Sequence, residues 1–169
     1  DMFLRLQHKD GSFPRKFKDD FSIVDKSGGS TPSATLPLVM GYKYFKDKRY
    51  LASAKRTADY LEKVLISKAD YFSSTLDANC EDKEASLYAA TAAYYLALAT
   101  KGAERAHYAG LARKAAYFAL SWYYVWDVPF AQGQMLGDIG LKTRGWGNVS
   151  VENNHIDVFV FEFASVLQW

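Results

Sequence analysis

The chain has 169 residues, of which 49% are hydrophobic and 24% charged, and its formal net charge is +2. This balance is typical of a globular protein with a buried core, and it excludes disordered, collagen-like and low-complexity classes. The densest basic stretch is only Arg15, Lys16 and Lys18, so we expect no nucleic-acid surface. The longest uncharged helical stretch, Ala85 to Thr100, is too short to span a bilayer comfortably. The lone Cys80 excludes an internal disulfide and a multi-thiolate zinc site.

Hydrophobic periodicity predicts helices over residues 32–46, 50–66, 83–99 and 104–126, and a last one that begins near His155. The first has Thr31 as a suitable N-cap and Pro32 as a suitable first residue. The helix over 83–99 and the one from His155 are apolar on nearly every face, so they must be enclosed. The helices over 50–66 and 104–126 are amphipathic and are predicted to lie outside, whereas the helix over 32–46 is mostly inner.

The helices repeat along the chain. Tyr42-Lys43-Tyr44 corresponds to Ala93-Tyr94-Tyr95 in the inner helices, and Tyr50-Leu51-Ala52 corresponds to His107-Tyr108-Ala109 in the outer ones. Repeats of helix pairs indicate a stacked or ring-like array of hairpins. We therefore expect an all-α fold of helical hairpin repeats forming a single domain over residues 1–169.

The connections from outer to inner helices are long, over residues 67–82 and 127–154, whereas the opposite turns are minimal. Long ordered loops are commonly functional. They lie at the end of the array where the N-termini of the inner helices meet, so we expect the site there.

An acidic cluster that includes Glu81, Asp82 and Glu84 precedes the helix over 83–99. Two carboxyl groups are what glycosidic-bond hydrolysis requires, and Glu81, Asp82 or Glu84 could supply one of them, with Asp82 and Glu84 as the preferred candidates. Acids in a first helical turn also cap the helix, with Asp82 the foremost candidate for a cap. Both interpretations stay open.

The connection after residue 126 carries a second group. Trp126 and Trp146 are candidate platforms for a sugar ring, and Trp146 lies between two glycines that cannot shield it. Asp127 is a further candidate acid, and Arg144 a candidate partner for a uronate carboxylate. The structural alternatives are a small loop core around Trp146 and a salt bridge for Arg144.

The segment Asn153-Asn154-His155 precedes the last predicted helix. Asn154 with Asp157 resembles a capping box, whereas His155 is suited to proton transfer near neutral pH. Asp10, in Asp10-Gly11-Ser12, is either a turn residue or another candidate acid.

The turn Asp10-Gly11-Ser12-Phe13-Pro14, the segment Gly28-Gly29-Ser30-Thr31-Pro32 and the helix-turn-helix pattern from Tyr44 to Ala54 resemble the (α/α)6-toroid, six-hairpin carbohydrate-active enzymes. The resemblance implies a partial toroid, because only about half of the helices of a full ring are present. It implies a glycoside hydrolase with catalytic residues among Asp10, Asp82, Glu84, Asp127 and His155, and with substrate contacts from Trp126, Arg144, Trp146, Asn153 and Asn154.

The alternatives are a polysaccharide lyase that uses Asn, His and Tyr side chains, and a non-catalytic module that binds a glycan or a protein. We expect no metal and no cofactor, since phosphate loops, nucleophile elbows and paired-histidine zinc motifs are missing from the sequence. The expected partners are an oligo- or polysaccharide and the remaining half of the toroid. The polysaccharide interpretation implies a periplasmic or secreted protein, although the chain begins without a signal-peptide pattern.

Overall fold

The computed structural model describes residues 2–72, 80–151, 156–157 and 161–169, and it is predominantly helical. The helices are α1 (Met2–Leu6), η1 (Gly28–Ser30), α2 (Thr31–Phe45), α3 (Lys48–Tyr60), η2 (Leu61–Ile66), α4 (Lys83–Ala99), α5 (Gly102–Leu120), α6 (Met135–Asp138) and α7 (Phe161–Gln168). Two antiparallel pairs of short strands accompany them, β1 (Lys16–Phe17) with β2 (Ile23–Asp25) and β3 (Gly147–Asn148) with β4 (Ile156–Asp157).

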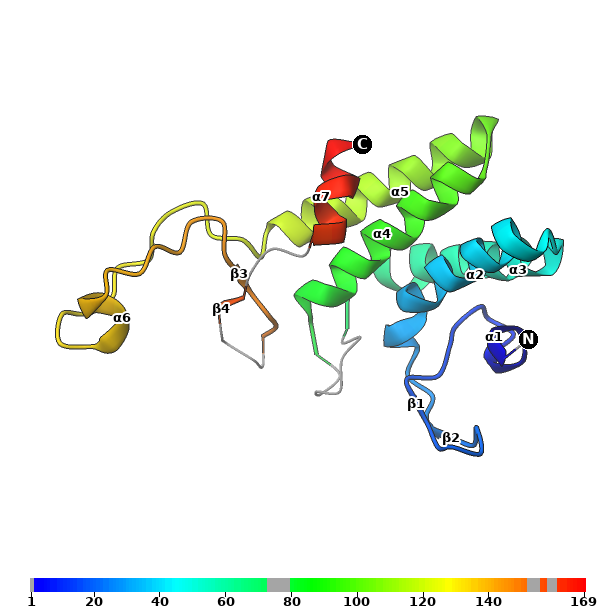
Figure 1. Cartoon of the computed structure of the whole chain (residues 1–169), viewed down its shortest axis with the longest axis horizontal. Coiled ribbons are helices and arrows are strands. Elements are labelled where there is room, and N and C mark those ends of the chain that lie inside the picture. The colour runs from blue at the N-terminus through cyan, green and yellow to red at the C-terminus, as the bar shows by residue number, and fades with distance from the viewer. Residues whose placement is uncertain (1, 73–79, 152–155, 158–160) are drawn as a thin grey trace.

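The helices form two layers (Figure 1). α2 packs against α4, and α4 packs in turn against α7, so these helices form one layer. α3 with its continuation η2 packs against α2, and α5 packs against α4 and η2, so these form the other. Each of the two described hairpins, α2–α3 and α4–α5, therefore contributes one helix to each layer. The prediction that the helix over 83–99 is enclosed on every face is wrong, since Tyr88 and Leu98 of α4 are each 40% exposed.

Local sequence signals explain most helix ends. The Asp47 carboxylate accepts a hydrogen bond from the N–H of Arg49 and caps α3, and Asp82 caps α4 in the same way. α2 ends where Lys46 adopts a left-handed conformation with φ of 58°. α2 begins one residue before the prediction, because Thr31 is already helical and its hydroxyl accepts the N–H of Phe13 at 2.9 Å.

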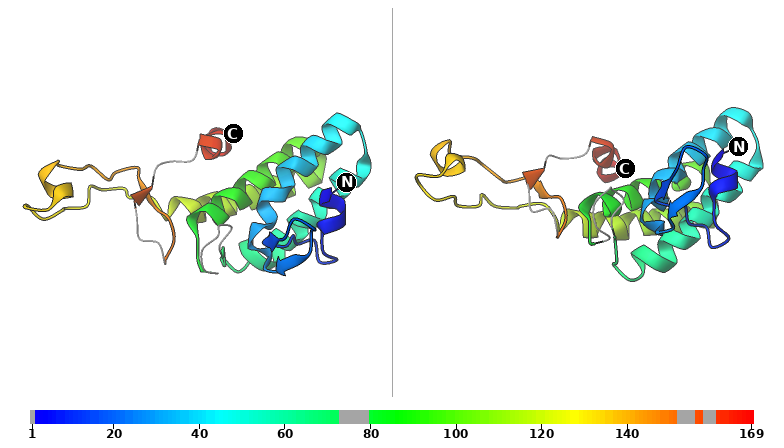
Figure 2. Two further views of the ribbon diagram at one scale, coloured as in Figure 1. Left: turned by 60° about the horizontal axis from the view of Figure 1, so that its bottom comes forward. Right: turned by 90° about the horizontal axis from the view of Figure 1, so that it is seen from below.

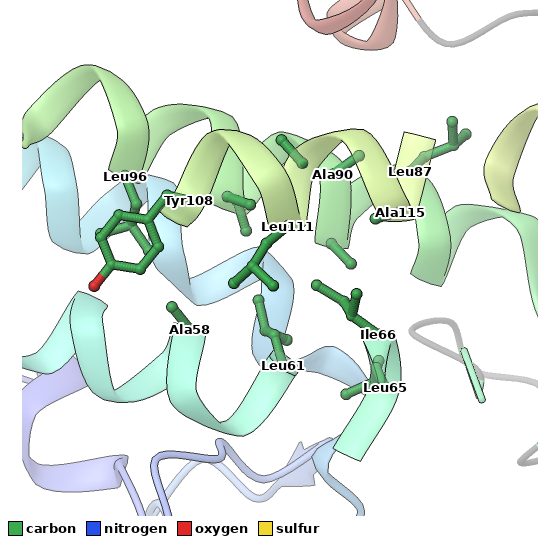
Figure 3. Packing of buried hydrophobic residues seen from close by; sticks show 14 of the residues in the cluster. Ala58, Leu61, Leu65, Ile66, Leu87, Ala90, Leu96, Tyr108, Leu111 and Ala115 are labelled. Carbon is green, nitrogen blue, oxygen red and sulfur yellow. The ribbon is translucent and has the colours of Figure 1, made fainter. Parts of the chain in front are cut away.

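The core lies between the two layers (Figure 3). Leu61, Leu65 and Ile66 of η2 face Leu111 of α5 across it, and all four are buried. Alanines fill most of the remaining positions of α4 and α5 that lie between layers, so the two helices approach closely. Each large apolar side chain that is buried here stabilises the fold by roughly 1.5–3 kcal/mol.

Burial confirms the internal repeat and corrects one of its offsets. In the inner helices, the buried residues Ala34, Thr35, Leu38 and Val39 of α2 correspond at an offset of 51 to Ala85, Ser86, Ala89 and Ala90 of α4. In the outer helices the sequence alignment implies an offset of 57. The structure gives 54, because Lys48–Ile66 and Gly102–Leu120 match at both ends and in most of their buried positions, such as Ala54 with Tyr108 and Leu65 with Ala119. The sequence alignment of the two outer helices is therefore displaced by three residues, which is about one helical turn.

The predicted helix over 104–126 is wrong at its C-terminal end. α5 stops at Leu120, and the chain then pairs with a later segment as an antiparallel ladder. The N–H of Tyr124 donates to Trp146 O at 2.8 Å, and the N–H of Asn148 donates to Trp122 O at 3.0 Å. Aromatic residues such as Trp122 to Tyr124 suit an extended chain as well as a helix, so the pairing with the later segment determines that this stretch is extended. Residues 122–148 form an arm that extends away from the helices (Figures 1 and 2).

The predicted start of the last helix near His155 is also wrong. Ile156 and Asp157 form β4 and pair with β3, and α7 begins at Phe161. Asp157 is therefore a strand residue and not the N3 residue of a capping box. α7 is nevertheless enclosed on one face, since Phe163 and Val166 are buried against the core.

None of the described helices combines the length and the apolar character that crossing a bilayer requires.

Candidate functional site

The segment that precedes α4 is where several parts of the chain meet. The N–H of Asp82 donates to Tyr71 O and that of Lys83 to Val149 O, both at 2.9 Å. The N–H of Val151 donates to Glu81 O at 3.2 Å. The end of the connection after η2 and the base of the arm therefore join at the N-terminus of α4, as the loop lengths predict.

Asp82 is a buried structural residue of this junction. Its side chain is 1% exposed, and Oδ1 accepts the N–H groups of Glu84 at 2.6 Å and Ala85 at 3.3 Å. These bonds place the side chain at the positive end of the helix dipole. The geometry is that of an N-cap, which is one of the two interpretations that the sequence leaves open.

Glu81, the neighbouring acid, has a different environment. Its Oε1 accepts the N–H of Tyr71 at 3.1 Å, whereas Oε2 is buried and has no hydrogen-bond partner among the described residues. Burial raises the pKa of the Glu81 carboxyl above its usual value. The bond from Tyr71 opposes this shift, and the charges of Asp70 and Asp82 add to it. A carboxyl of this kind keeps its proton at a higher pH than an exposed glutamate, as a general acid must.

Glu84 lies at the start of an exposed stripe along α4. The stripe runs through Tyr88, the half-buried Tyr95 and Leu98, and Tyr88 and Leu98 are each 40% exposed. α2 carries a matching stripe at the offset of 51, through Ser33, Pro37, Met40 and Tyr44. The inner helices thus share a partly aromatic surface that begins beside the acidic segment.

Lys83 is fully buried under the base of the arm. Its Nζ lies 5.5 Å from the centroid of the Tyr123 ring. Gly147 lies against the same side chain, since a Cβ there would be 3.1 Å from Lys83 Cδ. The glycine therefore allows the arm to close over the lysine, which ties the arm to α4.

Asp127 and Arg144 hold the arm together. Asp127 Oδ1 accepts the N–H groups of Thr143 at 3.0 Å and Arg144 at 3.1 Å, and Oδ2 lies 3.9 Å from the Arg144 guanidinium. The bond from the Arg144 N–H lowers the pKa of Asp127, and the charges of Lys142 and Arg144 also lower it. The carboxylate is therefore ionised, and Arg144 has the salt bridge that is its structural alternative.

The two tryptophans of the arm differ in exposure. Trp126 is 59% exposed, and its ring lies edge-on to Tyr124 with centroids 6.4 Å apart. Trp146 is half-buried, and its backbone belongs to the ladder at the base of the arm. Trp126 therefore offers the more open ring face.

Asp10 is placed in a turn of its own. Its Oδ1 accepts the N–H of Ser12 at 3.0 Å and the Ser12 hydroxyl at 2.7 Å, and this hydroxyl bond lowers the pKa of Asp10. His8 Nδ1 lies 3.0 Å from the same hydroxyl. Since the serine proton points to Asp10, the histidine is not its base, and the group lacks the proton relay of a nucleophilic triad.

The structure thus brings Asp82 and Glu84 together at α4, and Trp126, Asp127, Arg144 and Trp146 on the adjoining arm, whereas Asp10 stands apart in its turn. Asn153, Asn154 and His155 lie outside the described residues. Within the described part of the chain, no three His, Cys, Asp or Glu side chains gather where they could hold a metal ion.

Because Asp82 serves as the N-cap of α4, Glu81 is the neighbouring acid that has a buried oxygen and a raised pKa. The sequence offers Glu81 as a candidate beside Asp82 and Glu84 but does not favour it over them, because its burial depends on pairing with Tyr71 and Phe72. No protein-family model matches the sequence, and no solved structure matches the fold.

Proposed function

We propose that this chain is a carbohydrate-active domain, a glycoside hydrolase in which Glu81 is the general acid. The observation that carries the proposal is the Glu81 carboxyl, with one oxygen held by the Tyr71 N–H and the other buried without a partner among the described residues. A carboxyl that keeps its proton is what a general acid needs for the leaving oxygen of a glycosidic bond. Asp82 serves beside it as the helix cap.

Glu84 is the second carboxyl of the proposal. It lies in the first turn of α4, three residues after Glu81, and it starts the partly exposed stripe of α4. The two stripes carry the exposed Tyr44 and Tyr88 and the half-buried Tyr95, and tyrosine rings are of the kind on which sugars stack. The substrate in this proposal is an oligosaccharide that lies along the inner helices, with its scissile bond near their N-termini.

We also propose that the hairpins α2–α3 and α4–α5, with α7 as the next inner helix, are part of an (α/α)6 toroid. The offset of 51 between inner helices and of 54 between outer helices supports a regular array. So does the order of packing, in which each inner helix contacts the next.

The test is hydrolysis of a panel of neutral and uronate-containing oligosaccharides, followed by chromatography of the products. We expect the native chain to cleave one member of the panel. The control variant is Glu104→Gln, in the first turn of α5, and we expect it to cleave the same member. Glu81→Gln should lower turnover by roughly 10²–10⁴-fold, the usual contribution of a general acid. Full turnover in folded Glu81→Gln would contradict the assignment.

The exposed Trp126 favours a second candidate, a module that binds a glycan without cleaving it. In that case the panel stays intact, Glu81→Gln binds normally, and Trp126→Ala loses binding. The lyase alternative depends on Asn153, Asn154 and His155, which lie outside the described residues.

A further inference from the structure

The turn between α2 and α3 carries a surface that is both basic and aromatic. Lys43, Lys46 and Lys48 are exposed there, beside Tyr44, which is 81% exposed, and Phe45, which is 63% exposed. Among the residues that the structure describes, no carboxylate lies within ion-pairing distance of these three lysines. These five residues are called the basic turn below.

The acidic side chains at the same end of the helices already have basic partners. Asp47 Oδ2 lies 2.7 Å from Arg49 Nη2, and Glu104 Oε1 lies 2.5 Å from Lys55 Nζ. The positive charge of the basic turn is therefore not cancelled by these neighbours.

Backbone stability does not explain the choice of Lys46. This residue has a left-handed conformation, with φ of 58°, which glycine and asparagine adopt most readily. A lysine there keeps a positive charge at the tip of the turn at some cost in backbone strain.

Helix dipoles explain only part of the charge. Lys43 lies in the last turn of α2, where a positive charge is favoured. Lys48 begins α3, whose first turn holds no acid, so its charge lies at the positive end of that helix. The next turn has the same feature, because Lys101 precedes α5 and its side chain makes no capping bond. Departures from local preference are expected at functional sites.

The aromatic rings of the basic turn are ordered by one another. The Tyr44 ring lies edge-on to the Phe45 ring with centroids 4.9 Å apart. Phe45 in turn stacks on Tyr50 of α3, with centroids 5.9 Å apart and an interplanar angle of 24°. This stack still leaves most of the Phe45 ring in water, where an apolar side chain is unfavourable.

The basic turn lies at the far end of the inner helices from the candidate site (Figure 1). It follows the C-terminus of α2, whereas Glu81 and Glu84 lie at the N-terminus of the neighbouring α4. Hairpins of an array pack side by side, so a further hairpin would lie beside α2–α3 and not over its turn. The surface is therefore open whether or not the array continues.

We infer that the basic turn binds the surface of an anionic lipid bilayer. The lysines contact the headgroups, and Phe45 and Tyr44 lie at the boundary between headgroups and acyl chains. Lysines attract anionic lipids, and aromatic rings favour this boundary. The inference is independent of the proposed glycan chemistry, and this orientation leaves Glu81 and Glu84 directed away from the bilayer.

Phe45 favours a bilayer over a soluble polyanion. An acidic polysaccharide would attract the same lysines through charge, but it offers no apolar phase for an exposed phenyl ring. At the bilayer surface both parts of the basic turn are used, since charge and apolar burial add to each other.

Flotation of the full chain with lipid vesicles tests the inference. The vesicles contain either phosphatidylcholine alone or phosphatidylcholine mixed with the anionic phosphatidylglycerol, in about 20 mM NaCl so that charge is weakly screened. Dextran sulfate serves as a soluble polyanion without an apolar part. Circular dichroism verifies that each variant is folded.

The native chain is expected to float with the anionic vesicles, half-bound at about 1 mM anionic lipid, and not with phosphatidylcholine alone. Each lysine at an anionic surface contributes about fivefold to binding, so the double variant Lys46→Gln/Lys48→Gln should bind roughly 25-fold more weakly. The matched control Lys63→Gln/Lys114→Gln removes two exposed charges from η2 and α5 and should lose less than about threefold. Phe45→Ser should weaken vesicle binding by roughly fivefold or more and leave binding to dextran sulfate unchanged.

Three results would overturn the inference. The first is that the native chain stays unbound at about 10 mM anionic lipid. The second is an equal loss in the two double variants, since net charge alone would then attract the chain. The third is that Phe45→Ser floats as the native chain does, since the turn would then bind polyanions through charge and not insert into a bilayer.

Discussion

Replacing Asp82 by alanine is the sharpest test of how the N-terminus of α4 is built. The substitution removes the carboxylate that accepts the N–H groups of Glu84 and Ala85. The backbone bonds from Asp82 to Tyr71 and from Lys83 to Val149 stay available, because they do not involve the side chain. The effect therefore isolates the cap from the rest of the junction.

The magnitude follows from burial. Loss of an N-cap side chain costs about 1 kcal/mol. Asp82 is 1% exposed and Ala85 0%, so water cannot easily replace the carboxylate, and a buried donor without a partner costs a further ~1–3 kcal/mol. The expected destabilisation is ~2–4 kcal/mol, or a lowering of Tm by roughly 5–12 °C for a chain of this size.

Urea unfolding followed by circular dichroism measures this loss, with Asp82→Asn and Asp82→Ser as controls that keep a capping oxygen. Both controls should retain most of the stability. If Asp82→Ala unfolds at the same urea concentration as the native chain, the carboxylate is not a structural cap. Asp82 would then return as a candidate for the acid/base pair.

Three other substitutions test the packing and the electrostatics. Folding raises the pKa of Glu81 above its ordinary value of 4.5, so ionisation of this carboxyl opposes folding as the pH rises. Glu81→Gln should therefore raise Tm at pH 7 and leave it nearly unchanged at pH 4. A lower Tm at pH 7 would contradict the burial of this group. Leu61→Ala in the core, where the side chain is 1% exposed, should cost ~2–5 kcal/mol in a urea melt, and a loss under ~1 kcal/mol would mean that α5 does not pack on η2. Gly11 has a φ of 92°, and Gly11→Ala would place a Cβ 2.1 Å from the Arg56 carbonyl oxygen. Thermal melts should therefore show that the free energy of unfolding falls by roughly 1–3 kcal/mol. Unchanged stability would show that the turn does not contact α3.

Local sequence signals sufficed where a helix is specified by its own residues. The helix over 83–99 is predicted with the bounds that the structure has, because Asp82 caps it and an apolar run follows without a break. The helix over 50–66 is predicted almost as well, although its last turns widen into the π-helix η2. Its amphipathic pattern has one interpretation only, since a strand would scatter its apolar residues over both faces.

The remaining features depend on partners far away in the chain. Trp122 to Tyr124 continue the apolar pattern of α5, and only pairing with Gly145 to Asn148 draws them into the arm. Glu81 and Asp82 are adjacent carboxylic acids, and the sequence alone does not distinguish their roles. The contact with Tyr71 buries one carboxyl without a full set of partners, while the helix N-terminus satisfies the other.

The most direct measurement of the central claim is the pKa of the Glu81 side chain, from ¹³C NMR titration of its carboxyl carbon with Glu84→Gln and Glu104→Gln used to assign neighbouring signals. The account predicts that Glu81 titrates above the ordinary value of 4.5, so that it holds its proton at a higher pH than an ordinary glutamate does. A Glu81 carboxyl that titrates at or below 4.5 would mean that water or another group satisfies its second oxygen. The general acid would then have to be sought among the other carboxyl groups.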